Sequence, residues 1–358
     1  MKIIDRYILK EIFIYVGMCM LIFVTIYLII DVLQKIDDFM EAGTPIILVA
    51  KYFVYKLPFI FVQMTPVSLL ISVIVAYSLM RKNNELIALQ ASGIGIRRVC
   101  FPAIGLALFV VVFSFLISEL LVPYASSRAE TIWNKDVRKG KYKRFFRRRH
   151  IWYKGRSSIY SIESFDGKNG VMYKAVFYFF DKNFSVIKRI QAKKVVWTDG
   201  KWIAEDGILQ IKRKKNRGYD IVSFDTRRIN IPETPESFLR PVKRPEEMNY
   251  WQLKRYANEI KREGYDARRY FVDTYMKLSF PFINLVVVLV GIPAALKLKA
   301  SSIPVSISVG IGICFAYIVC MGIFRSLGIS GIMPPFLAAW MANIIFLLAG
   351  IHMMIHIE

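Results

Sequence analysis

Basic side chains are the residues of this chain most able to do chemistry. Residues 121–270 hold 36 Lys and Arg against 17 Asp and Glu, which is +19 of the chain's net +23. Two runs stand out, Arg138–Arg149 and Lys212–Arg217. Such a segment attracts anionic partners by long-range electrostatics, although a solvated basic surface without a ligand would have the same composition.

Residue sets for catalysis are missing from the sequence. It contains no G-x-x-x-x-G-K-[ST] phosphate loop, no H-E-x-x-H and no nucleophile elbow, and its three histidines form no ligand set. We therefore expect a non-enzymatic chain without a metal or cofactor of its own. Nucleic acid is not an expected partner either, because no helix-turn-helix, zinc finger or RNP-like motif accompanies the basic charge.

The elements that must position the basic residues are six uncharged apolar stretches, three on each side of the basic segment. Each is long enough to cross the ~30 Å hydrocarbon core as a helix. They contain almost no ionisable residue, which argues against a proton- or sodium-coupled carrier. The predicted spans are Ile12–Ile30, Leu57–Met80, Val99–Ser118, Leu278–Leu296, Ala300–Phe324 and Ser326–Ile351.

The short loops predict the orientation of the chain. With the N-terminus inside, the cytoplasmic side holds nine Lys and Arg, and the short outer loops hold four. By the positive-inside rule, both termini are then cytoplasmic and the large basic domain is outside.

The basic segment between the two sets of spans reads as β-structure. From Ile151 to Ile231 the period shifts towards two, and Asp-Gly turn signals lie at 166–167, 199–200 and 206–207. Serial hairpins favour a sandwich or a β-jelly roll. A linker with four prolines and a helix over Tyr250–Glu263 then lead back to the membrane. The predicted strands are Met172–Phe180, Lys193–Trp197, Trp202–Ala204 and Ile208–Lys212.

Two shorter helices are expected on the cytoplasmic side. Met1–Phe13 has an apolar face that suits a helix lying in the membrane interface before the chain turns into the first span. The loop at about 81–95 can form a short amphipathic helix, with Glu85 in its first turn and Gly93 at its end. That helix is either a docking element for a partner or a simple connector.

The predicted fold is therefore an α-helical membrane protein of six spans, three plus three, with an inserted all-β domain. Residues 1–122 form the first transmembrane bundle with its two short helices. Residues 123–270 form the β-jelly-roll domain with the linker and the re-entry helix, and residues 271–358 form the second bundle.

Several motifs, in order and on this layout, resemble the LptF/LptG (YjgP/YjgQ) permeases of the Gram-negative lipopolysaccharide exporter. The resemblance covers nearly the whole chain and is stronger to LptG than to LptF. The motifs are Asp5-Arg6-Tyr7-Ile8, Asn84-Glu85-Leu86, Gln90-Ala91-Ser92-Gly93, Glu119 with Val122-Pro123, the segment from Tyr256 through Gly264–Tyr270 and Lys277 to Pro281, and Gly331–Pro335.

The resemblance implies a bacterial inner-membrane protein with a periplasmic domain, acting in ATP-driven extraction of lipopolysaccharide for outer-membrane biogenesis. The implied partners are an LptF-like permease as heterodimer partner, a cytoplasmic LptB-like ATPase dimer that uses the ATP and Mg²⁺, and LptC-like and LptA-like periplasmic proteins. The coupling role of the cytoplasmic helix carries over to Glu85, with Arg81, Leu86 and Leu89 as flanking contacts.

The chemistry of such a substrate adds candidate residues. Lipopolysaccharide carries phosphates and many acyl chains, so cations near the outer boundary should lie above an apolar wall. The expected phosphate contacts are Lys35, Lys56, Arg128, Lys135, Arg138, Lys139 and Arg325. Aromatic residues of the β domain could line a path for acyl chains or could simply fill its core; they are Tyr173, Phe177, Phe179 and Trp197.

Two other classes of function fit the layout. A membrane sensor or assembly scaffold could bind an anionic ligand through its outer domain without moving it. A membrane-embedded enzyme fits less well, because no paired carboxylates or nucleophile–base set is visible in the spans.

Overall fold

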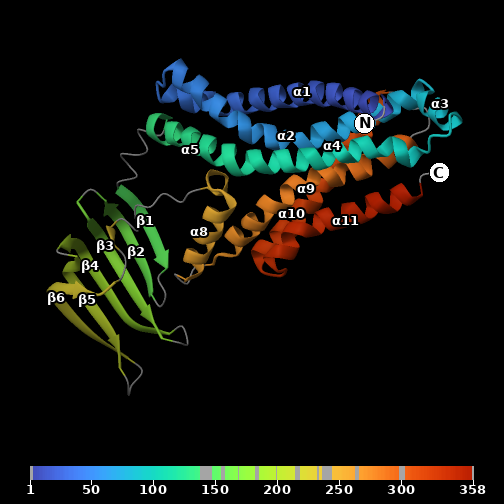
Figure 1. The fold of residues 1–358 in the computed structure, drawn as a ribbon. Helices are drawn as coiled ribbons and strands as arrows, with labels where there is room; N and C mark the ends of the chain where they lie inside the picture. Colours follow the sequence, from blue (N-terminus) through green and yellow to red (C-terminus); the bar gives the residue numbers. More distant parts are fainter. Residues whose placement is uncertain are drawn as a thin grey trace. The chain divides into compact units, whose positions relative to one another are not determined.

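The computed structural model describes residues 3–137, 147–154, 158–167, 169–181, 185–198, 200–213, 218–231, 234–235, 244–262, 266–297 and 303–356. Contacts divide the chain into two units. One comprises Met1–Ile132, Arg244–Ala257 and Ala267–Glu358, and the other comprises Trp133–Lys243 and Asn258–Asp266. The first unit holds the long apolar helices and the second holds a β-sheet (Figure 1).

In the part of the chain that the structure describes, six stretches of helix are long and apolar enough to cross a membrane, as predicted. The third, Ile96–Val137, is assembled from α4, the π-helical turn η1, α5 and the π-helical turn η2. A short helix, α3, separates the second and third stretches, and η3 and α8 precede the fourth. The helices are α1 (Ile3–Glu41), α2 (Ile46–Lys82), α3 (Glu85–Ala91), α4 (Ile96–Leu116), η1 (Ile117–Leu121), α5 (Val122–Ile132), η2 (Trp133–Val137), η3 (Pro245–Glu247), α8 (Tyr250–Arg262), α9 (Arg268–Lys297), α10 (Ile303–Ser330) and α11 (Pro335–Ile355).

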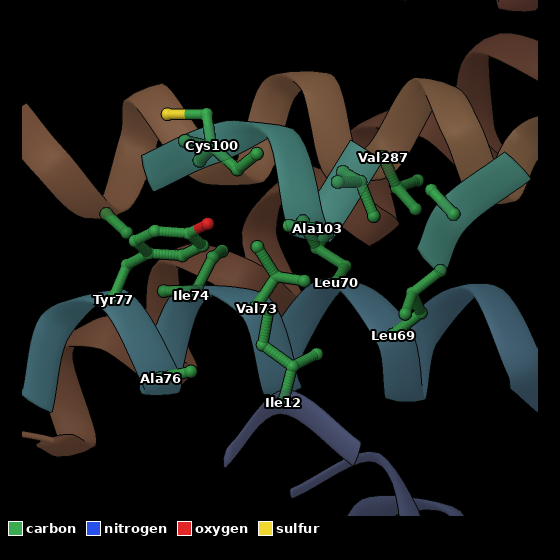
Figure 2. Close-up of a cluster of buried hydrophobic side chains, with 14 of the residues drawn as sticks. Ile12, Leu69, Leu70, Val73, Ile74, Ala76, Tyr77, Cys100, Ala103 and Val287 are labelled. Atoms are coloured by element: carbon green, nitrogen blue, oxygen red, sulfur yellow. The ribbon is translucent and has the colours of Figure 1, made fainter. Parts of the chain in front are cut away.

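Helices α2 and α9 form the centre of the membrane unit. In their most apolar stretches 72% of the residues are buried, against 11% in α1 and 17% in α10. Figure 2 shows Leu70, Val73 and Ala103 packed between α2 and α4, with Ile12 of α1 reaching Val73 from the other side. The Tyr77 hydroxyl donates to the backbone oxygen of Val99 (2.9 Å). Among the described residues, most of the apolar surface of α1 and α10 is therefore not covered by the other helices.

The first helix differs from the prediction of an interfacial helix followed by a turn. Residues Ile3–Glu41 form one unbroken α-helix of 39 residues. At 1.5 Å per residue it is roughly 58 Å long, about twice the hydrocarbon thickness. Ile8 and Ile12 are fully buried in the core of the unit, so tertiary packing continues the helix through the amphipathic segment.

The spans also extend into segments that the sequence assigned to outer loops. Lys51 and Lys56 lie within α2. The prediction that Arg325 sits in a loop is wrong, because α10 continues to Ser330 and the turn to α11 is formed at Gly331, whose φ is +84°. A charged residue can remain in a membrane helix when a neighbouring carboxylate compensates it, and hydropathy does not reveal such partners.

The second unit contains one antiparallel sheet of six strands in sequential order, β1-β2-β3-β4-β5-β6 (Figure 1). This confirms the predicted all-β insertion between two sets of helices. A meander of one sheet lacks the strand crossings that define a jelly roll, so the jelly roll stays a prediction. The strands are β1 (Arg147–Lys154), β2 (Ser158–Asp166), β3 (Val171–Phe180), β4 (Val186–Thr198), β5 (Lys201–Lys212) and β6 (Tyr219–Ile229).

The middle of the sheet has a charged crease, where two consecutive residues of each of the strands β2, β3, β4 and β5 point away from the core. Along a strand, successive core residues are usually two positions apart in the sequence. Across the crease they are three positions apart, as from Met172 to Ala175 and from Ala192 to Val195. Ion pairs connect the crease from strand to strand, including Lys174–Glu163 (3.1 Å). The crease consists of Glu163, Ser164, Tyr173, Lys174, Lys193, Lys194, Glu205 and Asp206.

The crease explains why the turn predicted at Asp206-Gly207 is wrong. Strand β5 runs through both residues, and the two segments predicted on either side of them are one strand. Asp206 has a φ of +49°, and a Cβ on Gly207 would meet the Phe224 ring and the Gln191 carbonyl oxygen. An Asp-Gly dipeptide is typical of a turn, but here Asp206 twists the strand locally and Gly207 leaves room for the Phe224 ring.

Candidate functional site

A cluster of ion-paired side chains joins α1 to α2. Asp31 is buried and accepts hydrogen bonds from Lys35 (2.5 Å), one turn later, and from Lys56 (2.7 Å) on α2. The aromatic ring of Tyr52 lies under both ammonium groups, at 5.4 and 5.5 Å. Two of the predicted phosphate residues are therefore brought together, but around an internal carboxylate.

Beside this cluster the membrane unit encloses a pocket of about 710 Å³. An apolar wall is formed by Phe59, Val62, Phe280 and Met321, each of which lies about one or two turns along its helix from a cation of the same pocket. The cations form a rim; they are Lys56, Arg244, Arg269, Lys277 and Arg325. An apolar wall next to a rim of cations is suited to an amphiphile with an anionic head.

Two of the pocket's cations are balanced by Asp273 of α9. Its buried carboxylate accepts from the Arg325 guanidinium (2.8 Å) and lies 4.0 Å from that of Arg269. The sequence alone does not indicate a site role for Asp273 or Lys277, because the predicted fourth span begins at Leu278. The signal that could have found them is the four-residue spacing of Arg269, Asp273 and Lys277, which places all three on one face of a helix.

The rim of the pocket is completed by η3 and α5. The backbone N–H of Arg244 donates to the Glu247 carboxylate (3.0 Å), and the Arg244 guanidinium lies 3.6 Å from Glu130. Burial raises the pKa of Glu247, and the nearby Glu130 and Glu246 add to the effect.

A π-helical turn positions the adjacent wall. In η1, Ser118 lines the pocket, and the next residue, Glu119, accepts a hydrogen bond from the backbone N–H of Tyr250 (2.8 Å). The extra residue of a π-turn re-aims side chains, and such turns are frequent at functional sites. Here the turn ties the third span to the first residue of α8.

The other predicted phosphate residues do not line this pocket or fall outside the described residues. Arg128 of α5 stacks its guanidinium on Tyr124 (5.4 Å), and Lys135 lies in η2. Neither is among the residues that line the pocket. Arg138 and Lys139 fall outside the described residues.

A second candidate site is formed by α3. Glu85 starts this helix and accepts a hydrogen bond from the Tyr7 hydroxyl of α1 (3.0 Å). Leu86 is buried in the core of the membrane unit and Leu89 packs against it. Arg81 donates to the backbone oxygen of Leu296 at the end of α9. The exposed face of α3 is formed by Ile87, Ala88, Gln90 and Ala91.

The four aromatic residues predicted for a lipid path do not share one surface. Phe177 is fully buried in the sheet core, and Phe179 and Trp197 pack against that core. Tyr173 belongs to the charged crease and is 38% exposed. Phe165 of β2 and Trp202 of β5 have ring centroids 6.4 Å apart although two strands separate them, so the sheet curves around this core.

The fold defines a multi-pass membrane protein with a pocket that is lined by both apolar residues and cations. A family model described as lipopolysaccharide export system permease LptF/LptG matches residues 6–356, and the chain belongs to this family. A comparison with curated proteins finds no match. The family places the protein in the inner membrane as a permease for lipopolysaccharide rather than an enzyme. It also implies a complex with an ATPase and a second permease, and it does not separate LptG from LptF.

Proposed function

We propose that this chain is a permease subunit of an ATP-driven exporter that extracts lipopolysaccharide from the inner membrane and passes it to a periplasmic bridge. The observation that supports the proposal most is the pocket, in which an apolar wall and a cationic rim meet within the membrane-spanning unit. Acyl chains fit the wall, and phosphates fit the cations.

The energy for transport would come from a partner. The sequence has no phosphate loop of its own. We propose that an LptB-like ATPase dimer binds ATP and Mg²⁺ and docks on α3, on the cytoplasmic side. Glu85 offers a carboxylate at the start of that helix, and Ile87 offers an apolar contact, 58% exposed, beside it. The buried Leu86 holds the helix in place from behind.

The remaining partners follow the same proposal. The weakly buried α1 and α10 suit a lipid-filled contact with an LptF-like permease in a heterodimer. The curved sheet suits the transfer of substrate to LptC-like and LptA-like proteins, with the large domain in the periplasm.

Reversing the charge of Glu85 tests the proposal. In Glu85→Lys, we expect the ATPase to be lost on purification and export to stop, because an ammonium group would replace the carboxylate that is proposed to dock the partner. The chain should still fold and insert. The measurements are co-purification of the ATPase and the appearance of lipopolysaccharide at the outer membrane.

Tyr7→Phe is the matched control, since it removes the internal hydrogen bond and keeps the carboxylate. It should retain the ATPase. If Glu85→Lys binds the ATPase and exports normally, the coupling role is wrong. If the native chain co-purifies with no ATPase and no second permease, the scaffold function becomes the better description.

A further inference from the structure

We infer that Lys277 is the residue that selects a phosphate head group in the pocket, an inference that rests on the proposed function. The other four cations of the pocket already have internal carboxylates. Lys56 is paired with Asp31 at 2.7 Å, and Arg325 is paired with Asp273 at 2.8 Å. The two weaker pairs are Arg269–Asp273 at 4.0 Å and Arg244–Glu130 at 3.6 Å.

Lys277 differs from these four cations. Its side chain is half-buried, and among the described residues no carboxylate lies within 4.0 Å of its ammonium group. Glu119, Glu246 and Asp273 influence it electrostatically without forming an ion pair. A desolvated charge without a partner is costly, so an ammonium in this position is best explained by an anion that arrives from outside.

The position of Lys277 along α9 indicates what kind of anion it receives. Arg269, Asp273 and Lys277 follow one another at four-residue intervals along the pocket, and Phe280 comes next. No charged residue follows Lys277 before Lys297, near the other end of the helix. Lys277 is therefore the last charge before the apolar wall begins.

A ligand that uses both parts must carry an anionic group and acyl chains on the same head group, as a phosphorylated lipid does. An ammonium is a compact point charge that suits a phosphate without demanding a fixed geometry. Free phosphate could satisfy the charge but would leave the apolar wall empty. The geometry thus favours a phosphorylated lipid head over a free anion.

The test compares phosphorylated and dephosphorylated lipid on the full-length chain. The chain, with the subunits that co-purify with it, is reconstituted in phosphatidylcholine nanodiscs, and binding is measured for bisphosphorylated lipid A, dephosphorylated lipid A, phosphatidylglycerol and inorganic phosphate. The native chain should prefer bisphosphorylated over dephosphorylated lipid A by about ten-fold, as one charge-assisted contact predicts.

Lys277→Met should abolish that preference and leave the affinity for dephosphorylated lipid A unchanged. Lys277→Arg should retain most of it. The matched control is Lys51→Met, which removes an exposed lysine of α2 that does not line the pocket. Because Lys277 has no internal partner, Lys277→Met should melt no earlier than the native chain.

The outcomes separate the two levels of the proposal. A native chain that binds no phosphorylated lipid would overturn the proposed function itself. A preference that persists in Lys277→Met, or a much lower melting temperature of that variant, would overturn only the role of Lys277. A parallel loss of phosphatidylglycerol binding supports phosphate recognition, whereas tight binding of inorganic phosphate alone would overturn the assignment to a lipid.

Discussion

Asp31 shows how a single residue changes the meaning of its neighbours. On sequence alone, Lys35 and Lys56 are cations available for phosphate. In the structure both donate to the same buried carboxylate, which has 9% of its side chain exposed. Asp273 does the same for Arg325. The membrane unit therefore neutralises four of the five cations of the pocket, and the affinity for an external anion depends on the remaining one.

Removing the Asp31 carboxylate should destabilise the membrane unit. Asp31→Asn removes the negative charge that both half-buried ammonium groups contact and leaves two positive charges next to each other. Because both lysines keep some access to water, we expect a loss on the order of 2 kcal/mol in the free energy of unfolding. The measurement is denaturant unfolding of the full chain in detergent.

Asp37→Asn is the control for that change, since Asp37 is an exposed carboxylate on the same helix. It should have little effect. If the two variants unfold alike, the cluster does not stabilise the contact between α1 and α2.

At the scale of elements, the sheet and the first helix both depart from their sequence patterns for reasons of packing. Helix α1 runs unbroken through a segment whose amphipathic pattern is typical of an interfacial helix, because Ile8 and Ile12 are buried against other helices. Strand β5 runs through a turn dipeptide, because Phe224 occupies the space above Gly207. In both cases a contact distant in sequence overrides the local signal.

Filling the space at Gly207 should therefore disturb the sheet. In Gly207→Ala the new methyl group would collide with the Phe224 ring and the Gln191 carbonyl oxygen. Overpacking of this kind costs about 1–3 kcal/mol. We expect earlier thermal unfolding of the sheet, followed by tryptophan fluorescence in a full-length chain that keeps Trp202 and has its other five tryptophans replaced by Phe.

Gly218→Ala provides the comparison, because a Cβ at Gly218 meets nothing within 4 Å. It should leave the transition unchanged. Equal stability of the two variants would show that the sheet relaxes around Gly207 without cost.

At the scale of the whole molecule, the described residues combine six helices long and apolar enough to span a membrane with an inserted sheet unit of strongly basic sequence. Short-loop charge, rather than the charge of the large domain, predicts the orientation. This would place α3 and both termini in the cytoplasm and the sheet in the periplasm, so that energy and substrate are handled on opposite sides.

Cysteine labelling in intact cells tests this orientation. Lys193→Cys, at a side chain 79% exposed on β4, should react with a membrane-impermeant maleimide from outside. Ser92→Cys, at the exposed end of α3, should react only after the inner membrane is permeabilised. The unsubstituted chain, whose four cysteines lie within or at the edge of spans, gives the background. The opposite pattern would contradict the predicted topology.

The sequence by itself determined the six spans, the β insertion and the short helix at Glu85. These follow from local properties, namely the length of an apolar run, the period of a strand and the position of a loop. The order of its motifs also determined the family resemblance. The sequence did not predict the ends of the spans. A charged residue in a membrane helix is read as part of a loop as long as the carboxylate that compensates it is unknown.

Only the tertiary structure decided which charged residues are free to act. Asp31 and Lys56 are 25 residues apart, and Asp273 and Arg325 are 52 apart, so no local pattern indicates that they pair. The same holds for Tyr7 and Glu85, which are 78 apart. Electrostatic compensation depends on distance in space, so Lys277 became distinctive only when the partners of the other cations were known.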